Sequence, residues 1–500
     1  MFKNYLKIAW RNLRKDRQFT LLNLVGLSTG MACTLLIYLW VTDELNVDRF
    51  HQNDARLFQI MVNNHNAGTV STVPQTPALL AQALAKEIPG IDYAAATVTT
   101  IGLKKTTLSA GDKLTKAIGQ YAGKDYFRMF SWHLLAGKED QVLASKNSIV
   151  LSRDLAIRLF GTAEKVIGKP VSWQKDKLYI VSGIFEGTPA NSSIQFDYVM
   201  SYENFLDERP YEKDWNNSDP NTYLVLKEGV DPARFNQRIA GFLKTKIPGT
   251  TASLYLQPFS SGYLHGKYEN GVQAGGRIEY VRLFSLIAVF ILILACINFM
   301  NLSTAKAAGR MKEVGIKKVV GASRGALVLQ YLSESMLMSF LSLLIALSLV
   351  AVLLPSFNAL TGKQLALRFD SPLLLCIISV GLLTGLMAGS YPALYISGFA
   401  PVAILQRKLR NTPGELWIRK GLVVFQFTLS VSFIVSVLVV YRQIEFIQTA
   451  NEGFNKENTI SFDMEGKFST PEEMKAFTTG VQSLLQEVKE VPGIVNASSM

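Results

Sequence analysis

Cysteine and histidine are scarce in this sequence, and their scarcity excludes several kinds of site. Only three cysteines occur in 500 residues, and all lie within long apolar runs (Cys33, Cys296 and Cys376). A domain outside the membrane therefore has no disulfide to stabilise it. The four histidines stand apart from one another, without an HExxH motif or a cysteine partner, which argues against a metal site (His51, His65, His133 and His265).

A nucleotide-binding loop is also missing from the sequence. Each Gly-Lys pair, such as Gly168-Lys169 or Gly362-Lys363, lacks the upstream glycine and the following Ser or Thr of a P-loop. We find no catalytic motif either. We therefore predict that the chain is not an enzyme, that it binds no cofactor, and that any ATP it uses is hydrolysed by a partner subunit.

Long apolar runs, by contrast, are abundant. The chain is 49% apolar with a mean hydropathy of +0.19, yet 18% of its residues are charged, a mixture that indicates membrane spans plus a large soluble domain. A helix needs about 20 residues to cross the hydrocarbon core. We predict five transmembrane helices, at 21–42, 281–303, 326–354, 372–397 and 421–441.

The formal charge of +12 comes from short segments that flank these runs. Six Lys or Arg accompany one acid in both 1–20 and 304–325, and five accompany one acid in 397–420. The long segment 43–280 is nearly neutral, with 26 basic and 25 acidic residues. This distribution follows the positive-inside rule, and it argues against nucleic acid as a partner.

The charges predict the topology, and the residue pattern predicts the fold class. The N-terminal segment 1–20 and the loops 304–325 and 398–420 are expected in the cytoplasm, and the segments 43–280 and 442–500 outside. Strand-like stretches such as "KLYIVSGIF" alternate with amphipathic ones such as "TPALLAQALAKEI" in the first exterior segment. We predict an α-helical multi-span membrane domain joined to an α+β extracytoplasmic domain.

An internal repeat links the two ends of the chain. "RKDRQFTLLNL" at the first span is echoed by "RKGLVVFQFTLSVS" at the fifth, with the shared Gln-Phe-Thr-Leu 408 residues apart. "KEIPGI" (86–91) returns as "KEVPGI" (489–494), 403 residues later. Two echoes in the same order at nearly the same offset indicate a duplication. We therefore expect 442–500 to begin a second extracytoplasmic domain in a second copy that is cut short.

The predicted spans contain few polar or helix-breaking residues. Small residues at four-residue spacing favour close packing of membrane helices, and they occur in the first and fourth spans (Gly26 and Gly30; Gly381, Gly385 and Gly389). Pro392 is expected to break or kink the fourth span. Glu334, near the cytoplasmic start of the third span, either extends to the membrane surface or faces the bundle interior, and we favour the interior.

The segment that joins the second and third spans has the features of a short, well-capped helix. Glu313 and Lys317 have the favourable i,i+4 order for an ion pair, and Lys317 and Lys318 complement the dipole of the last turn. Gly321 fits a C-cap and Ser323 an N-cap of the next helix. The residues alone leave two interpretations equally open: a cytoplasmic helix pushed as a rigid body, or a basic loop resting on anionic lipid.

The same segment carries a resemblance to a known family. "NFMNLSTAKAAGRMKEVGIKKVVGASRGALVLQYLSES" resembles FtsX-like, MacB-type permeases of ABC transporters, and "YIVSGIFEGTPANSSIQFDYVMS" resembles their periplasmic core domain. The resemblance covers nearly all of 1–500. It implies a subunit of a bacterial inner membrane whose coupling helix docks on a separate ABC ATPase. By this resemblance, the coupling residues are Arg310, Glu313, Gly315, Lys317, Lys318, Gly321 and Ser323.

The resemblance also implies a function and its partners. Family members are thought to pass ATP-driven motion across the bilayer to the outside domain, and the shortage of ionisable residues in the spans agrees with the lack of a hydrophilic path. We expect export of a peptide, lipoprotein or drug, with the ATPase, the bilayer, and a second permease copy or a periplasmic adaptor as partners. Two alternatives stay open: a membrane-anchored sensor or scaffold without ATP use, and an FtsX-type regulator of cell-wall hydrolases.

Overall fold

A computed structural model describes residues 2–66, 68–99, 105–174, 177–398, 413–449, 459–460 and 471–499. It consists of two units. The helical unit comprises Met1–Asn46 and Gly276–Ala450, and the second unit comprises Val47–Gly275 and Asn451–Met500. Most of the predicted loop 398–420 and much of 442–500 lie outside the described residues.

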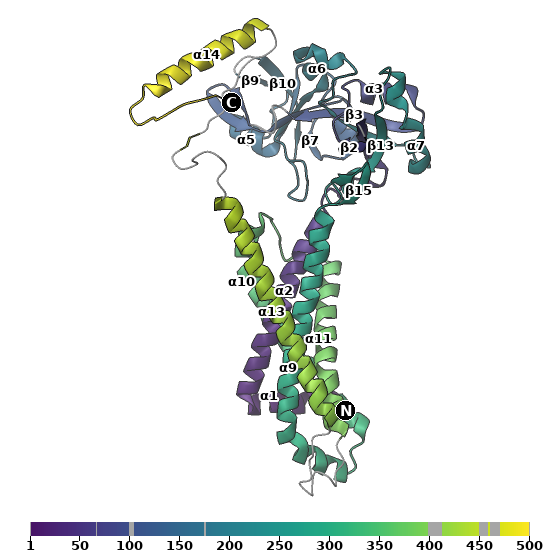
Figure 1. Ribbon diagram of the computed structural model, residues 1–500, viewed down its shortest axis with the longest axis vertical. Coiled ribbons are helices and arrows are strands. Elements are labelled where there is room, and N and C mark those ends of the chain that lie inside the picture. Colours follow the sequence, from purple (N-terminus) through teal and green to yellow (C-terminus); the bar gives the residue numbers. More distant parts are fainter. Residues whose placement is uncertain are drawn as a thin grey trace. The chain divides into compact units, whose positions relative to one another are not determined.

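The helical unit is a bundle of long apolar helices (Figure 1). Its helices are α1 (Phe2–Lys15), α2 (Arg17–Leu45), α9 (Arg277–Val319), α10 (Arg324–Thr361), α11 (Ser371–Gly398) and α13 (Pro413–Thr449). Five helical stretches are long and apolar enough to cross a membrane (Arg17–Leu45, Arg277–Lys306, Arg324–Thr361, Ser371–Gly398 and Lys420–Thr449). Each overlaps one of the predicted spans and extends beyond it, because the helices continue through the polar residues that flank the apolar runs.

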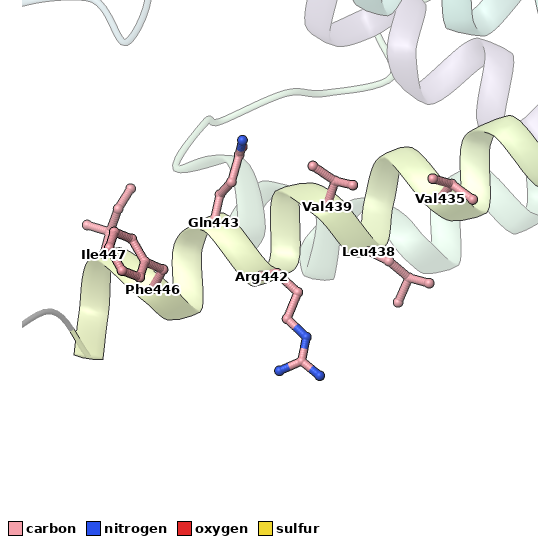
Figure 2. A pocket seen from close by; sticks show the side chains of 7 residues that line it. All are labelled: Val435, Leu438, Val439, Arg442, Gln443, Phe446 and Ile447. Atoms are coloured by element: carbon pink, nitrogen blue, oxygen red, sulfur yellow. The ribbon is translucent and has the colours of Figure 1, made fainter.

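Helix α2 is the packing centre of this bundle. Leu27, Met31 and Leu35 are at most 1% exposed, because α9 and α10 both pack against this helix. Helix α13 differs, since no residue of its most apolar stretch is buried in the described structure. One face of α13 presents an open, mostly apolar surface (Figure 2), formed by Val435, Leu438, Val439, Arg442, Gln443, Phe446 and Ile447.

The second unit is built on one large mixed sheet. The strand order is β13-β1-β12-β3-β6-β11-β8-β10-β9-β4-β5, with β2 beside β1 and β7 beside β10. Only the β6–β11 and β8–β10 pairs are parallel among the described strand pairs. The strands are β1 (Leu57–Asn66), β2 (Thr69–Val73), β3 (Ile91–Thr99), β4 (Thr106–Ala110), β5 (Lys113–Ala117), β6 (Gly119–Ala122), β7 (Leu134–Ala136), β8 (Ser148–Ser152), β9 (Pro170–Trp173), β10 (Lys177–Phe185), β11 (Tyr198–Ser201), β12 (Asn221–Leu226) and β13 (Ser253–Pro258). A separate hairpin is formed by β14 (Lys267–Glu269) and β15 (Val272–Gly275).

Short helices accompany this sheet. They are α3 (Leu80–Glu87), α4 (Tyr126–Phe130), α5 (Arg153–Phe160), α6 (Tyr202–Glu208), α7 (Pro232–Ile239) and α8 (Phe259–Gly262), and the same unit includes α14 (Pro471–Lys489). Sequence signals explain α5: the Ser152 side chain accepts a hydrogen bond from the Leu155 amide, and Gly161 ends the helix with φ +79°. The predicted α+β fold is confirmed.

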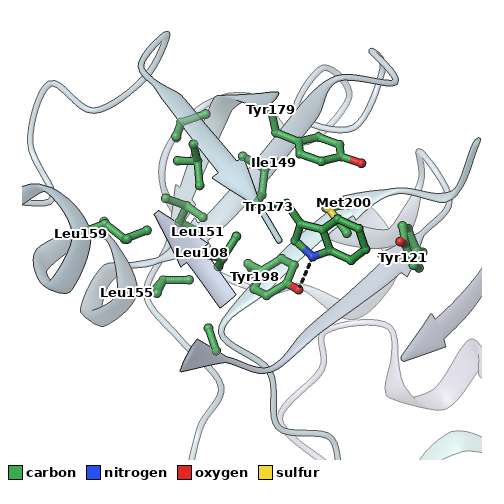
Figure 3. Close-up of a cluster of buried hydrophobic side chains, with 14 of the residues drawn as sticks. Leu108, Tyr121, Ile149, Leu151, Leu155, Leu159, Trp173, Tyr179, Tyr198 and Met200 are labelled. Carbon is green, nitrogen blue, oxygen red and sulfur yellow. Dashed lines mark hydrogen bonds between the residues drawn. The ribbon is translucent and has the colours of Figure 1, made fainter. Parts of the chain in front are cut away.

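Buried aromatic side chains stabilise the sheet unit without disulfides. In one core cluster the Trp173 indole N–H donates to the Tyr198 hydroxyl at 2.9 Å (Figure 3). Tyr198 and Leu151 are fully buried there. Large aromatic side chains bury about 150–250 Å² each. Burial of this apolar surface therefore stabilises the unit in the absence of disulfide bonds between the described cysteines.

Candidate functional site: the α9–α10 turn and the helices that hold it

The turn between α9 and α10 is short and fully capped. Gly321 has φ +99°, its amide donates to the Lys318 carbonyl at 3.0 Å, and the Ala322 amide donates to the Lys317 carbonyl at 2.9 Å. These two bonds form a Schellman motif, which needs a residue that tolerates a positive φ. The Ser323 hydroxyl then accepts a hydrogen bond from the Ala326 amide, so α10 begins at once. Both caps are placed as the sequence indicated.

The segment before the turn differs from the expected short, separate helix. Helix α9 is continuous from Arg277 to Val319, so span and coupling segment belong to one 43-residue helix, and that expectation was wrong. The physical reason is that 277–319 contains no proline, and an interior glycine such as Gly315 costs only about 1 kcal/mol relative to alanine. The side chain of Arg310 lies outside the described residues.

The two lysines at the end of α9 point toward the bundle. The Lys317 ammonium donates to Glu313 at 2.7 Å and to the Gln330 side chain of α10 at 3.1 Å. The Lys318 ammonium donates to the Ser397 carbonyl at 2.7 Å, in the last turn of α11, where a cation complements the helix dipole. These bonds attach the turn to both neighbouring helices.

An apolar cluster reinforces this attachment. Val314 is fully buried and packs with Leu327 and Tyr331 of α10 and with Ala393 and Ile396 of α11. The turn is therefore a rigid extension of the α10–α11 pair, not a loose loop.

Three aliphatic side chains are exposed on and beside the turn. Ile316, Val319 and Val320 are 65%, 66% and 82% exposed. We call these three residues the tip. The residues expected to couple to an ATPase are charged, capping or glycine residues, and the three residues of the tip are not among them. The signal was present as apolar residues on either side of the two lysines in "GIKKVVG".

Glu334 faces the bundle interior, as favoured from the sequence. It is 9% exposed, and one of its carboxylate oxygens accepts a hydrogen bond from the Asn12 side chain of α1 at 2.7 Å. Both residues line a cavity of about 40 Å³, which has room for a few water molecules. Lys306 also lines it, pairs with Asp16, and lies 4.3 Å from the centre of the Phe19 ring. The contact between α1 and Glu334 had no signal in the local sequence.

The glycines of the fourth span lie where α11 crosses α10. A Cβ atom at Gly385 would lie 3.2 Å from the Met336 Cα, and one at Gly389 would lie 2.6 Å from the Ser335 Cβ. At Gly381 a Cβ would lie 3.0 Å from a Leu343 methyl group, and the Gly381 carbonyl accepts a hydrogen bond from Ser339 at 2.7 Å. Close approach of the two backbones therefore requires glycine here.

The glycines of the first span have a similar place on α2. A Cβ at Gly30 would lie 2.6 Å from the Ala295 Cβ of α9, and one at Gly26 would lie 3.1 Å from the Asn298 side chain. Pro392 is buried within α11 and does not end that helix, which runs on to Gly398. Of the expected break or kink, the break is therefore wrong and the kink stays a prediction; Ala393 and Ile396, just after the proline, pack against Val314 of α9 and Leu327 and Tyr331 of α10.

Two family models match this chain. The model of the MacB-like periplasmic core domain matches residues 20–242, and the model of the FtsX-like permease C-terminal region matches residues 285–401. The chain belongs to the family of FtsX-like, MacB-type permeases. With several apolar helices, the permease is a multi-pass membrane protein.

Curated relatives are similar over different lengths. The macrolide export ATP-binding/permease protein MacB of Salmonella paratyphi A is 23% identical over 433 residues, covering 81% of the permease and 61% of the relative. The protein of the same name from Bdellovibrio bacteriovorus is 32% identical over 126 residues, covering 25% and 19%. The permease thus spans about three-fifths or less of the length of these relatives.

Solved structures are similar over less than half of the chain. A domain of a permease protein from Porphyromonas gingivalis is 24% identical with a TM-score of 0.36, covering 42% of the permease and 93% of that chain. The periplasmic region of MacB from Actinobacillus actinomycetemcomitans is 17% identical with a TM-score of 0.31, covering 42% and 90%.

Proposed function

We propose that this permease is the membrane subunit of an ABC transporter and that the tip is the surface that docks on a separate cytoplasmic ATPase. One observation carries the proposal: aliphatic side chains are held exposed on a turn that hydrogen bonds and buried contacts fix rigidly to the bundle. An exposed apolar patch on a rigid support is typical of an interaction site. A basic loop resting on lipid headgroups would instead direct its lysines outward.

The topology in this proposal follows the charge distribution. The N-terminus and the α9–α10 turn lie in the cytoplasm of a bacterial inner membrane, and the α+β unit lies outside. ATP binding on the partner moves the turn, the α10–α11 pair moves with it, and the movement reaches the outside domain. The permease itself hydrolyses no ATP. Its cargo is exported or handed on outside, with peptides, lipoproteins and drugs as the chemical classes to test.

Co-purification tests the docking. The permease extracted from native membranes should bring with it a subunit that hydrolyses ATP. Replacing Val320 by Glu should release that subunit, because burying a carboxylate in an apolar contact is costly. Gly325→Glu is the matched control: it adds the same carboxylate in the first turn of α10, outside the tip, where a Cβ meets nothing within 4 Å and an acid complements the helix dipole.

The outcomes separate this proposal from its rival. A sensor or scaffold without ATP use would bring down no ATPase, with either the parent protein or the variants. Equal retention of the ATPase by parent, Val320→Glu and Gly325→Glu would contradict docking at the tip.

A further inference from the structure

The connector between α10 and α11 is a built structure. Gly362 ends α10 with φ +67°, and the Asn358 side chain then brackets Leu365: its amide donates to the Leu365 carbonyl at 2.9 Å and its oxygen accepts from the Leu365 amide at 3.1 Å. Leu365 is 8% exposed and belongs to the same apolar cluster as Leu35 and Leu39 of α2. These two hydrogen bonds hold the connector in place on both sides of its charged residue, Lys363.

Lys363 bridges the connector to the end of α2. Its ammonium lies 2.7 Å from a carboxylate oxygen of Asp43 and 2.9 Å from one of Glu44. The side chain of Lys363 is 16% exposed and that of Glu44 is 4% exposed. We call Lys363, Asp43 and Glu44 the clasp.

The clasp is charged on both sides. Burial alone lowers the pKa of Lys363, but the hydrogen bonds and charges of Asp43 and Glu44 outweigh it, so the pKa lies above its ordinary value. The Asp43 side chain is 24% exposed, while those of Lys363 and Glu44 are largely buried. Removing one partner of such a group is costly, because the remaining buried charges lose part of their compensation. A surface ion pair would contribute almost nothing by comparison.

The clasp lies where α2 leads into the α+β unit. Asp43 and Glu44 lie in the last turn of α2, which ends at Leu45, and the chain enters the α+β unit at Val47. At the opposite end of the bundle, Lys317 and Lys318 join the turn to α10 and α11. The α10–α11 pair, which packs closely along the α11 glycines, is thus bonded to the end of α9 on one side of the bundle and to the end of α2 on the other.

We propose that the clasp is the joint through which movement of the α10–α11 pair passes to α2 and so to the α+β unit. This inference rests on the proposed function, and it assigns a role to three residues that the sequence did not relate to one another. The chemistry suits the task, since a buried ion group keeps two helical segments in fixed register as they move.

The test uses the permease with its ATPase in membranes and compares three variants with the parent. Lys363→Met removes the cation at nearly constant length. The triple variant Lys363→Met, Asp43→Asn, Glu44→Gln removes the whole ion group and leaves no buried charge, so it keeps the test valid if Lys363→Met alone misfolds. Lys363→Arg keeps the cation and is the matched control.

Two readouts are taken for each protein. The first is association with the ATPase and the rate of ATP hydrolysis. The second is the change on adding nucleotide in the distance between spin labels at Lys113, in exposed strand β5, and Leu360, which is 84% exposed at the end of α10.

We expect the parent and Lys363→Arg to show a nucleotide-dependent distance change, and Lys363→Met and the triple variant to lose it while retaining association and hydrolysis. If the neutral variants keep the full distance change, the clasp is not the joint, although the proposed function stands. If the parent binds no ATPase and shows no nucleotide response, the proposed function and the clasp both fail.

Discussion

His51 is a titratable residue buried in the core of the α+β unit. It is 3% exposed within a ring of aromatic side chains, and its Nδ1 lies against the Phe130 carbonyl. The centres of the Phe50, Trp132 and Phe259 rings lie 4.2, 5.1 and 5.5 Å from that of the imidazole. Burial disfavours the imidazolium and lowers the pKa of His51 to about 4. The neutral imidazole is therefore part of the core.

This lowered pKa predicts a pH-dependent stability. Between pH 6.5, near the unfolded pKa, and about 4, the unfolded chain binds the proton more readily, so stability falls as pH falls through this window. The loss amounts to about 3 kcal/mol when complete. Thermal unfolding of the purified permease followed by tryptophan fluorescence at pH 7.5 and 5.0 checks this. His51→Phe should lose less stability on acidification than the parent, and an equal loss in both would refute the assignment.

Gly321 is the residue on which the turn depends. Nothing lies within 4 Å of a Cβ built there, so a substitution acts through backbone strain at φ +99° and not through a clash. Gly321→Val should therefore disrupt the Schellman motif, at a cost of about 1–2 kcal/mol. It should also reduce assembly of the permease with the ATPase. Gly321→Asn, which tolerates positive φ better, is the control. Normal assembly of the valine variant at equal expression would show that the shape of the turn is unimportant.

A substitution at Glu313 distinguishes the two interpretations of this segment, a helix pushed as a rigid body and a basic loop resting on lipid. Its pair with Lys317 is partly exposed and contributes only about 0.3–0.5 kcal/mol to stability. Glu313→Lys should nevertheless impair ATP hydrolysis by the complex, because Lys317 then faces a like charge and its bond to Gln330 is disturbed. A lipid-resting loop would tolerate the added positive charge. Unchanged hydrolysis and assembly would favour the loop.

At the scale of elements, the close packing of α10 on α11 predicts that these helices tolerate no added side chain at their contact. Gly385→Ala should lower the melting temperature of the permease in detergent, because the added Cβ meets the α10 backbone at Met336. Gly325→Ala is the matched control: it lies in the first turn of α10 with nothing within 4 Å, and alanine is the better helix former. Equal melting temperatures for the two variants would contradict the packing argument.

The sequence predicted what local pattern and composition determine. Apolar runs marked the spans, four-residue glycine spacing marked the α10–α11 contact, and Gly321 and Ser323 marked the caps. It missed what depends on tertiary contacts. The inward direction of Lys317 and Lys318 follows from their hydrogen bonds to Gln330 of α10 and to the Ser397 carbonyl of α11.

The clasp illustrates the same limit most clearly. Lys363 and Asp43 are 320 residues apart, and no local pattern relates them. The pair Gly362-Lys363 drew attention in the sequence only because it is not part of a P-loop. The contact of Asn12 with Glu334 is equally distant, at 322 residues.

At the scale of the whole molecule, the charge distribution predicts sidedness. Single cysteines at Lys113 or Lys213, both exposed in the α+β unit, should react with a membrane-impermeant reagent added to intact spheroplasts. A cysteine at Val320 should react only after the membrane is opened. Labelling of Val320 in intact spheroplasts would reverse the proposed orientation.

The duplication remains a prediction at this scale. Helix α13 contains the second copy of the Gln-Phe-Thr-Leu motif, and the glycines of the two "PGI" echoes, Gly90 and Gly493, have φ +106° and +96°. A positive φ is usual for the glycine of a Pro-Gly turn, so this agreement follows from the shared dipeptide.

The central claim is that the tip contacts an ATPase, and site-specific photocrosslinking tests it most directly. A photoreactive amino acid is placed at Val320 in native membranes, with Leu360 at the other end of α10 as the control position. The account predicts a crosslink from Val320 to a subunit that hydrolyses ATP, and none from Leu360. A crosslink from Val320 to lipid alone would contradict it and leave the basic segment as a signal for topology only.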